Sequence, residues 1–182
     1  MIKRLFVALP ISEKLQAEIA AWEKKFSQLP VRWLAGKNLH ITLVAPWEEA
    51  EENIPGILEI LKNYRNDPAL KNFPKITEID FSKVRFGPSP FTPRLIWAEG
   101  ETPAELTELK KTLGRVLNLP DHRPFSPHLT LARFRPEEFN GFSIKELDES
   151  IDWTETFTDF VLMESRLLPD GADYRIMERF AF

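Results

Sequence analysis

The sequence predicts an α+β fold in which two lobes, each an antiparallel sheet with outer helices, face each other across a central cleft. Apolar runs of strand length alternate with segments of helical periodicity in two successive series. The tetrapeptide His40-Ile41-Thr42-Leu43 returns once, as His128-Leu129-Thr130-Leu131. No flexible linker separates the series, so we expect residues 1–182 to form one compact domain of two pseudo-symmetric lobes.

The first series opens with a strand and a capped helix. Residues 2–9 form an apolar run that Pro10 ends. Ser12 is a typical N-cap, and the helix after it continues to about residue 26. Apolar side chains recur along this helix at helical spacing, as expected for a face on the core: Leu15, Ile19, Trp22 and Phe26.

The first motif lies in the next strand. A short extended segment at 31–34 precedes it, and the strand itself covers residues 39–45. Pro46 should end this strand because proline cannot donate a ladder hydrogen bond. Acidic residues 48–52 then lead into a helix whose apolar residues are Ile57, Leu58, Leu61 and Tyr64.

The second series begins with a hairpin and another helix. Residues 73–86 and 94–98 form two strands around a proline-rich loop. Thr102 and Glu105 have the spacing of a capping box, which predicts a helix start. The inner stripe of this helix consists of Leu106, Leu109, Leu113 and Val116.

The second motif strand and a hairpin complete the predicted fold. The motif strand covers residues 128–134. Residues 136–150 are predicted to be irregular with a short helix. Strands at 157–167 and 174–182 then pair across Pro169-Asp170-Gly171, a typical turn sequence.

Each copy of the motif places an imidazole and a hydroxyl on one face of its strand, because residues i and i+2 point to the same side. His40 is paired in this way with Thr42, and His128 with Thr130. Imidazole acts as a general acid or base near neutral pH, and threonine can donate a hydrogen bond to an anionic oxygen. Two such units in one cleft predict a metal-free site for phosphoryl chemistry.

Composition excludes several classes of protein. The chain contains 0 cysteines, so a disulfide framework, a thiol nucleophile and a zinc–thiolate site are impossible, and we expect a reducing, cytoplasmic location. No segment approaches the ~20 apolar residues that span a bilayer, so we expect no membrane partner. The net charge of −4 differs from the basic field of a protein that coats nucleic acid. An RNA substrate would therefore be held at its terminus by a few local contacts.

Several stretches resemble the 2H phosphoesterase superfamily, and within it the RNA 2′,3′-cyclic phosphodiesterase branch, also called LigT-like or 2′-5′ RNA ligase proteins. These stretches occur in the order 4–10, 38–43, 125–133 and 164–167. The chain departs from the branch at Val44-Ala45-Pro46-Trp47-Glu48, where a Phe-Leu-Gly-Glu-like turn is usual. The departure leaves both motifs intact but affects the expected substrate preference.

The resemblance implies hydrolysis of RNA 2′,3′-cyclic phosphate ends to 2′-phosphomonoesters, with 2′-5′ ligation as the reverse reaction. It implies that His40 is the proton donor and His128 the proton acceptor, while Thr42 and Thr130 bind the phosphate. We expect no cofactor and no metal. RNA termini are the expected partner, no obligate protein partner is evident, and we expect a monomer.

Three residues outside the motifs are further candidate substrate contacts: Arg135, Trp47 and Phe125. The two aromatic residues could stack on a terminal base, although core packing is the better explanation for each of them. Arg133 lies five residues after His128, so an ideal strand places it on the opposite face.

Other functions stay open at this point. One is a phosphodiesterase for 2′-5′ oligonucleotides or another cyclic phosphate. A second is a metal-dependent phosphodiesterase, which would normally add carboxylates at ligand spacing that the sequence lacks. The others are a non-catalytic module that binds RNA ends and a structural or partner-binding protein.

Overall fold

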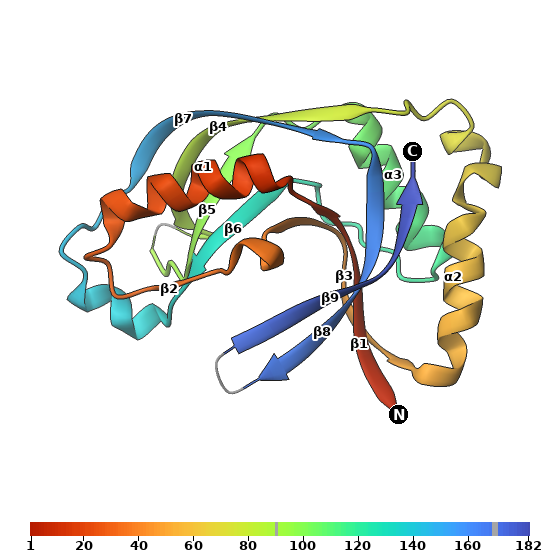
Figure 1. Cartoon of the computed structure of the whole chain (residues 1–182), viewed down its shortest axis with the longest axis horizontal. Coiled ribbons are helices and arrows are strands. Elements are labelled where there is room, and N and C mark those ends of the chain that lie inside the picture. Colours follow the sequence, from red (N-terminus) through yellow and green to blue (C-terminus); the bar gives the residue numbers. More distant parts are fainter. Residues whose placement is uncertain (90, 169–170) are drawn as a thin grey trace.

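The computed structural model describes residues 1–89, 91–168 and 171–182, which form an antiparallel sheet flanked by helices (Figure 1). Within these residues nine strands pair in the order β7-β4-β5-β6-β3-β1-β8-β9, and β2 pairs with β6. The strands are β1 (Ile2–Pro10), β2 (Arg32–Trp33), β3 (His40–Ala50), β4 (Thr77–Gly87), β5 (Leu95–Gly100), β6 (His128–Arg133), β7 (Asp148–Phe157), β8 (Asp159–Leu168) and β9 (Gly171–Ala181). The α-helices are α1 (Glu13–Glu23), α2 (Ile54–Lys62) and α3 (Ala104–Val116).

The sheet consists of two lobes that meet at the motif strands. One lobe contains β7, β4, β5, β6 and β2, and the other contains β3, β1, β8 and β9. The predicted α+β class, with antiparallel strands and outer helices, is confirmed. The two predicted sheets are continuous, because Ile41 of β3 pairs with Leu129 of β6. Both residues lie inside the motifs, so this pairing brings the two motifs together at the junction of the lobes.

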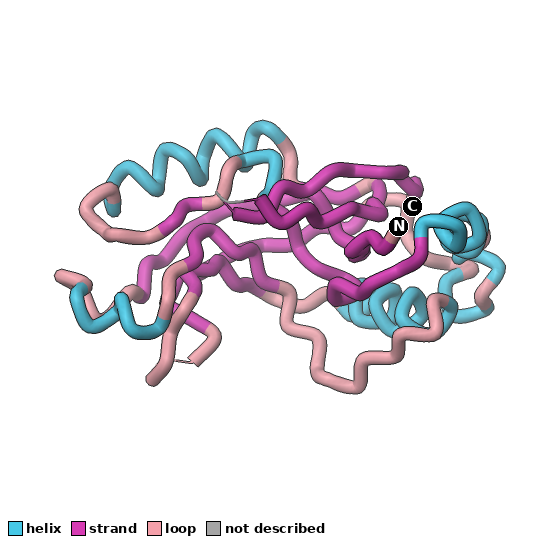
Figure 2. The backbone as a smooth tube through the Cα atoms, turned by 90° about the horizontal axis from the view of Figure 1, so that it is seen from below, coloured by secondary structure: helices cyan, strands magenta, loops and turns pink. Residues whose placement is uncertain are grey.

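The lobes do not follow one another along the chain. β1 lies between β3 and β8, so the hairpin β8–β9 completes the lobe that β1 begins. α1 follows β1 but packs on the other lobe, where Trp22 contacts Trp33 of β2 and Trp153 of β7 edge to face. α3 follows β5 and packs against β3. Figures 1 and 2 show α1 over one lobe and α2 and α3 beside the other.

The faces of the motif strands opposite the histidines lie in the hydrophobic core. Ile41, Leu43, Leu129 and Leu131 are at most 1% exposed. They belong to one cluster with the stripe residues Leu15, Ile19 and Trp22 of α1 and Leu106, Leu109 and Leu113 of α3. Burying each such side chain contributes about 1.5–3 kcal/mol, so both motif backbones are held firmly.

Strand β3 continues through Pro46, which contradicts the prediction that this residue ends it. Leu5 pairs with Trp47 and Val7 with Val44, and the register shifts between them. Pro46 therefore lies in an irregular part of the ladder, where its missing N–H removes no regular hydrogen bond.

The predicted capping box of α3 is wrong. The N-cap is Pro103, which makes no side-chain cap hydrogen bond. The Glu105 carboxylate instead accepts a hydrogen bond from the Thr77 hydroxyl at 3.1 Å. A tertiary contact thus uses the side chain that the local pattern assigned to the helix start.

The sequence also failed to predict β7, part of which falls in the segment expected to be irregular. Its alternation is interrupted by Glu155, which faces inward and is only 5% exposed. The Glu155 carboxylate accepts hydrogen bonds from the Ser12 backbone N–H at 2.9 Å and from its hydroxyl at 2.8 Å. Ser12 also caps α1 as predicted, through a bond from the Leu15 N–H at 3.2 Å. The buried carboxylate therefore joins the start of α1 to β7.

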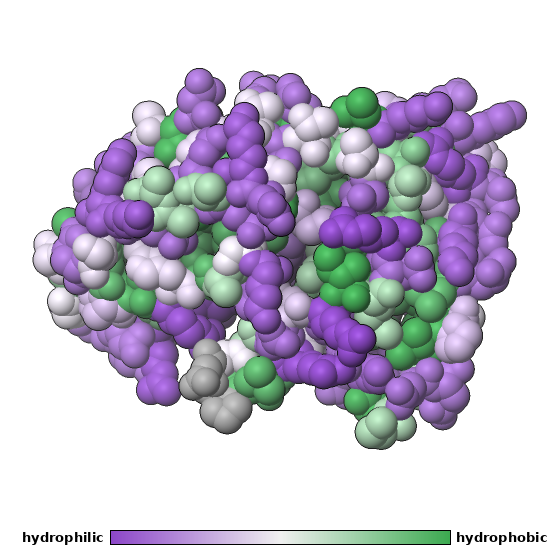
Figure 3. All heavy atoms as spheres, viewed as in Figure 1, coloured by the Kyte–Doolittle hydropathy of each residue, from purple (hydrophilic) through white to green (hydrophobic). Residues whose placement is uncertain are grey.

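The predicted final hairpin is present as β8 and β9. Of its predicted turn, Pro169 and Asp170 lie outside the described residues. Hydrophilic side chains cover most of the face in Figure 3. Within the described ranges, no helix has the length and apolar content needed to cross a membrane.

Candidate active site

The first motif ends in a β-bulge. Along the β1–β3 ladder Ala8 pairs with Thr42 and Val7 pairs with Val44, which leaves Leu43 as the extra residue. Leu43 and Val44 are both buried although they are neighbours on a strand. The bulge therefore shifts the alternation directly after the motif.

The second motif ends in the same way. Trp97 pairs with Thr130 and Ile96 pairs with Ala132, so Leu131 is the extra residue. Leu131 and Ala132 are both buried, whereas Arg133 after them is exposed. The bulge brings Arg133 to the face that carries His128 and Thr130. The prediction from an ideal strand, which placed Arg133 on the opposite face, was wrong for this reason.

The antiparallel pairing of Ile41 with Leu129 arranges the four motif side chains crosswise. His40 lies across from Thr130 at one end of the site, and Thr42 lies across from His128 at the other. Thr42 and His128 line one cavity of about 270 Å³. Each end of the site thus combines the histidine of one motif with the threonine of the other.

The His40 ring is fixed by a backbone carbonyl and two aromatic rings. Its Nδ1 lies 2.7 Å from the Asn38 carbonyl oxygen. A carbonyl oxygen can only accept, so Nδ1 carries the hydrogen and Nε2 is left for chemistry. The ring centroids of Phe6 and Tyr174 lie 4.9 and 5.1 Å from that of His40.

Asn38 is in turn held by strand β9. Its side-chain amide donates to the Ala172 carbonyl at 2.9 Å, and its amide oxygen accepts from the Tyr174 backbone N–H at 3.2 Å. Asn38 is only 8% exposed. The backbone carbonyl that orients His40 is therefore anchored to β9 from the other end of the sequence.

The surroundings of His40 favour its neutral form. Burial lowers the pKa of His40 to about 4, although the hydrogen bond to the Asn38 carbonyl opposes this change. The nearby positive charge of Arg133, followed by that of His128, lowers the pKa further. Before substrate binds, the His40 imidazole is consequently neutral at pH 7.

His128 repeats this arrangement. Its Nδ1 lies 3.1 Å from the Ser126 carbonyl oxygen, again two residues before the histidine. The Trp97 ring packs on it with centroids 4.6 Å apart. In both motifs a backbone carbonyl thus fixes the tautomer of the histidine ring and leaves its Nε2 atom for chemistry.

A family model described as the 2′-5′ RNA ligase superfamily matches residues 11–167, a stretch that includes both motifs. The chain belongs to this superfamily. Two proteins named RNA 2′,3′-cyclic phosphodiesterase are similar over nearly their whole length. That of Archaeoglobus fulgidus is 29% identical and that of Methanocaldococcus jannaschii 26%, each match covering 97% of this chain and 99% of the relative.

Solved structures share the fold of this superfamily member. E. coli LigT complexed with 3′-AMP superposes with a TM-score of 0.77 at 22% identity, covering 100% of this chain and 99% of LigT. The protein TT0787 of Thermus thermophilus gives a TM-score of 0.76 at 23% identity, covering 98% of this chain and 97% of its own. These likenesses show that the bilobal arrangement is common to the compared proteins.

The three candidate substrate contacts outside the motifs, Phe125, Trp47 and Arg135, lie in three different parts of this superfamily member. Phe125 lines the cavity shared by Thr42 and His128. Trp47 packs partly on the core, and its indole N–H donates to the Glu49 carboxylate at 3.2 Å. Arg135 lines a separate groove with Arg133. The structure therefore brings Phe125 to the cavity of His128, which neither Trp47 nor Arg135 lines.

The cavity at the His128 end also contains a buried lysine that no sequence pattern had indicated. Lys110 of α3 is 9% exposed, and its ammonium lies 3.3 Å from the Asp121 carboxylate. Hydrogen bonds from Arg123, with a smaller contribution from Lys110, hold the pKa of Asp121 well below its usual range. No three His, Asp or Glu side chains of the described segments lie close enough together to hold a metal ion.

Proposed function

We propose that this protein hydrolyses 2′,3′-cyclic phosphate ends of RNA to 2′-phosphomonoesters by metal-independent catalysis with two histidines. The observation that carries the proposal is the repeated arrangement of His40 and His128, each with Nδ1 on the carbonyl two residues before it, on motif strands that pair through Ile41 and Leu129. The names of the two relatives support the same substrate. A cyclic phosphate needs an acid on one side of phosphorus and a base on the other.

In the proposed reaction His128 Nε2 takes a proton from water while the water oxygen bonds to phosphorus. The bond from phosphorus to the 3′ oxygen breaks, and protonated His40 gives its proton to that oxygen. The 2′ oxygen keeps the phosphate. Each proton transfer of this kind typically contributes 10²–10⁴-fold to the rate.

The threonines act on the phosphate rather than on the protons. The Thr42 and Thr130 hydroxyls donate hydrogen bonds to the non-bridging oxygens, where negative charge builds up in the transition state. Arg133 adds a positive charge beside them. This arrangement stabilises the transition state more than the singly charged substrate.

Substrate binding allows His40 to take up the proton that it needs from solvent. The cyclic phosphate is an anion, and an anion beside an imidazole raises the pKa of that imidazole. His40 is thus neutral before binding and gains a proton together with the substrate. With a 5′ hydroxyl in place of water as the nucleophile, the same site would open the cyclic phosphate and give a 2′-5′ linkage.

The direct test uses an RNA oligonucleotide that ends in a 2′,3′-cyclic phosphate, incubated with the protein in EDTA. We expect a 2′-phosphate product with wild type, and its loss in His40→Asn and in His128→Asn. His122→Asn changes the third histidine of the chain and serves as the matched control. Turnover only after addition of a divalent metal would contradict the proposal and favour the metal-dependent alternative. No turnover under either condition would leave another cyclic phosphate or an RNA-end binding module.

The monomeric state, the cytoplasmic location and the organisation of residues 1–182 as one two-lobed domain stay predictions. So does the absence of a cofactor, a membrane partner and an obligate protein partner.

A further inference from the structure

A groove beside the active site is lined by three arginines. It has a volume of about 580 Å³, and its walls include Arg32 of β2, Arg133 of β6 and Arg135. We propose that this arginine groove binds the sugar–phosphate backbone of the RNA immediately 5′ of the terminal nucleotide. The proposal rests on the proposed function and adds the direction in which the RNA lies in the cleft.

The positive charges in the groove do not stabilise the fold. Arg32 and Arg133 are directly opposite each other in the β2–β6 ladder, and like charges in this position destabilise a sheet. Among the described residues, none of the ion pairs involves Arg32, Arg133 or Arg135. An anion in the groove would relieve this repulsion, and a phosphodiester matches the planar guanidinium group.

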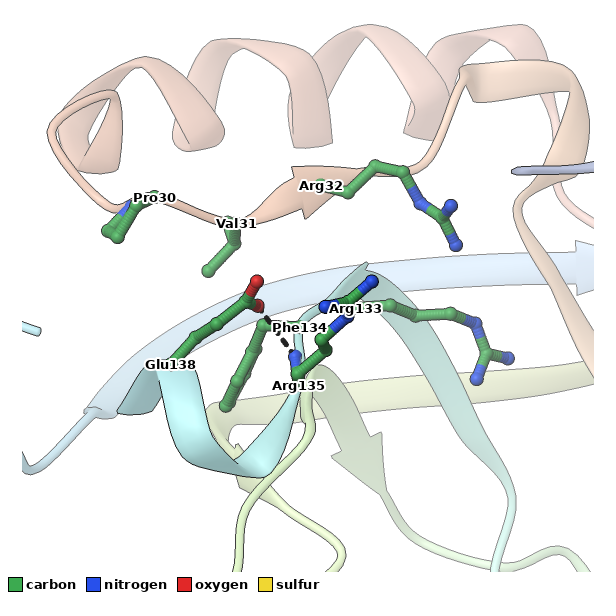
Figure 4. Close-up of a pocket in the computed structure, with 7 residues that line it drawn as sticks. All are labelled: Pro30, Val31, Arg32, Arg133, Phe134, Arg135 and Glu138. Carbon is green, nitrogen blue, oxygen red and sulfur yellow. Dashed lines mark hydrogen bonds between the residues drawn. The ribbon is translucent and has the colours of Figure 1, made fainter. Parts of the chain in front are cut away.

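The groove wall also contains one carboxylate, that of Glu138. It accepts a hydrogen bond from the Arg135 backbone N–H at 2.7 Å and, within the part of the chain that the structure describes, forms no ion pair with Arg32, Arg133 or Arg135. Figure 4 shows this bond, and it shows the Arg32 and Arg133 side chains extending in the same direction from the two sides of the groove. The two guanidinium groups therefore lie on the same side of the groove, where both can contact one anion.

The groove continues toward His40. Arg32 and Arg133 also line a smaller cavity of about 160 Å³. Asn38 and Tyr174, the residues that position and enclose His40, line that same cavity. A chain of anionic groups could thus extend from the histidines into the arginine groove without crossing the core.

The proposed roles of the histidines decide the direction. The 3′ oxygen leaves toward His40, so the ribose and the upstream nucleotides lie on the His40 side of phosphorus. Water enters from the His128 side. The arginine groove opens from the His40 side. The first upstream phosphate of the RNA would therefore meet Arg32 and Arg133.

The Arg32 guanidinium group lies close to a glycine at the start of β9. Gly171 has a φ of +122°, and a Cβ atom there would lie 2.7 Å from Arg32 Nη1. The missing side chain lets the guanidinium group lie against the backbone. Strand β9 therefore anchors His40 through Asn38 and lies beside Arg32.

The test compares two substrates that share the reacting group. Adenosine 2′,3′-cyclic phosphate lacks a 5′ phosphate, whereas a cyclic-phosphate-ended oligoadenylate of three nucleotides has two internal phosphates. We expect Arg32→Gln and Arg135→Gln each to reduce the preference for the oligonucleotide, measured as the ratio of kcat/KM values, roughly tenfold. The slope of log(kcat/KM) against log salt for the oligonucleotide should decrease by about 0.7 for each lost phosphate contact.

Two matched variants remove one charge elsewhere. Lys62 lies on α2, so Lys62→Gln should leave the substrate preference unchanged. Lys111→Gln removes a cation from a cavity at the opposite end of the cleft. A loss of preference in Lys111→Gln but not in Arg32→Gln would overturn the proposed direction. An equal fall for both substrates in Arg32→Gln would overturn the backbone contact, provided that the melting temperature is unchanged.

Failure of the proposed function would be recognised separately. Wild type would then turn over neither substrate, and the groove would be tested by fluorescence anisotropy with an oligoadenylate that ends in a 2′-phosphate. Roughly tenfold weaker binding by Arg32→Gln than by Lys62→Gln would still support the groove. Equal binding by the two variants would overturn it.

Discussion

The depressed pKa of His40 makes a strong prediction about stability. The folded protein protonates this residue only near pH 4, whereas an unfolded chain protonates it near 6.5. The unfolded state therefore binds an extra proton between these values. Stability should be undiminished above pH 6.5, fall as the pH drops from 6.5 to 4, and show no further change from this residue below pH 4.

The size of the effect follows from the two pKa values. The difference between 6.5 and about 4 corresponds to about 3 kcal/mol, at about 1.4 kcal/mol for each tenfold change in proton affinity. His40→Asn removes the titrating group and keeps a side-chain N–H that can donate to the Asn38 carbonyl. Other groups titrate in the same range, so the difference between wild type and this variant is the informative quantity.

Urea unfolding at pH 7, 5.5 and 4 measures that difference. We expect wild type to lose about 3 kcal/mol more than His40→Asn between pH 7 and 4. An NMR titration of the imidazole should place its midpoint near 4 and move it upward when phosphate is added. Parallel stability profiles, together with a midpoint near 6.5, would refute the reasoning that burial beside Arg133 keeps His40 neutral.

Three further predictions concern neighbouring residues. Arg133→Gln removes a positive charge near His40, so the NMR midpoint of His40 should rise while kcat/KM for the cyclic phosphate falls about tenfold or more; an unchanged midpoint would show that the charge does not act on the ring. Thr42→Val and Thr130→Val preserve shape and remove the donors, so single-turnover rates should fall about 10- to 1,000-fold with little change in melting temperature. Wild-type rates in both variants would remove the threonines from the mechanism. Glu155→Ala leaves the Ser12 N–H and hydroxyl without their acceptor and should lower the free energy of unfolding by about 1–3 kcal/mol, measured against Glu13→Ala on the exposed side of the same turn.

The sequence was sufficient to predict the motifs and most elements because their signals are local. The alternation around His40 and His128 identifies each strand and its buried face without knowledge of any partner. Ser12 and the apolar stripe of α1 likewise depend on neighbours in the chain. These features survive folding because the core requires the same faces that the pattern indicates.

The features that the sequence did not predict depend on tertiary partners. Whether Leu131 lies in a bulge is decided by the register with β5, and the position of Arg133 follows from that bulge. The sequence did not predict β7 because Glu155 interrupts its alternation of polar and apolar residues. This carboxylate is buried only because Ser12 packs beside it and donates hydrogen bonds to it. Lys110 and Tyr174 reach the site from α3 and β9, and no local pattern connects either element to the motifs.

The interleaved order of the lobes has a consequence for synthesis. On the ribosome, both histidine motifs emerge before β9, which carries the contacts of Asn38 and lies beside Arg32. A nascent chain that ends before β9 contains every residue assigned to acid–base chemistry, yet it lacks Tyr174 and the anchor for the carbonyl that orients His40. Long-range pairing of this kind forms late in folding. Competence therefore arises only after β9 has been synthesised, so chains that end before β9 would carry the motifs without an ordered site.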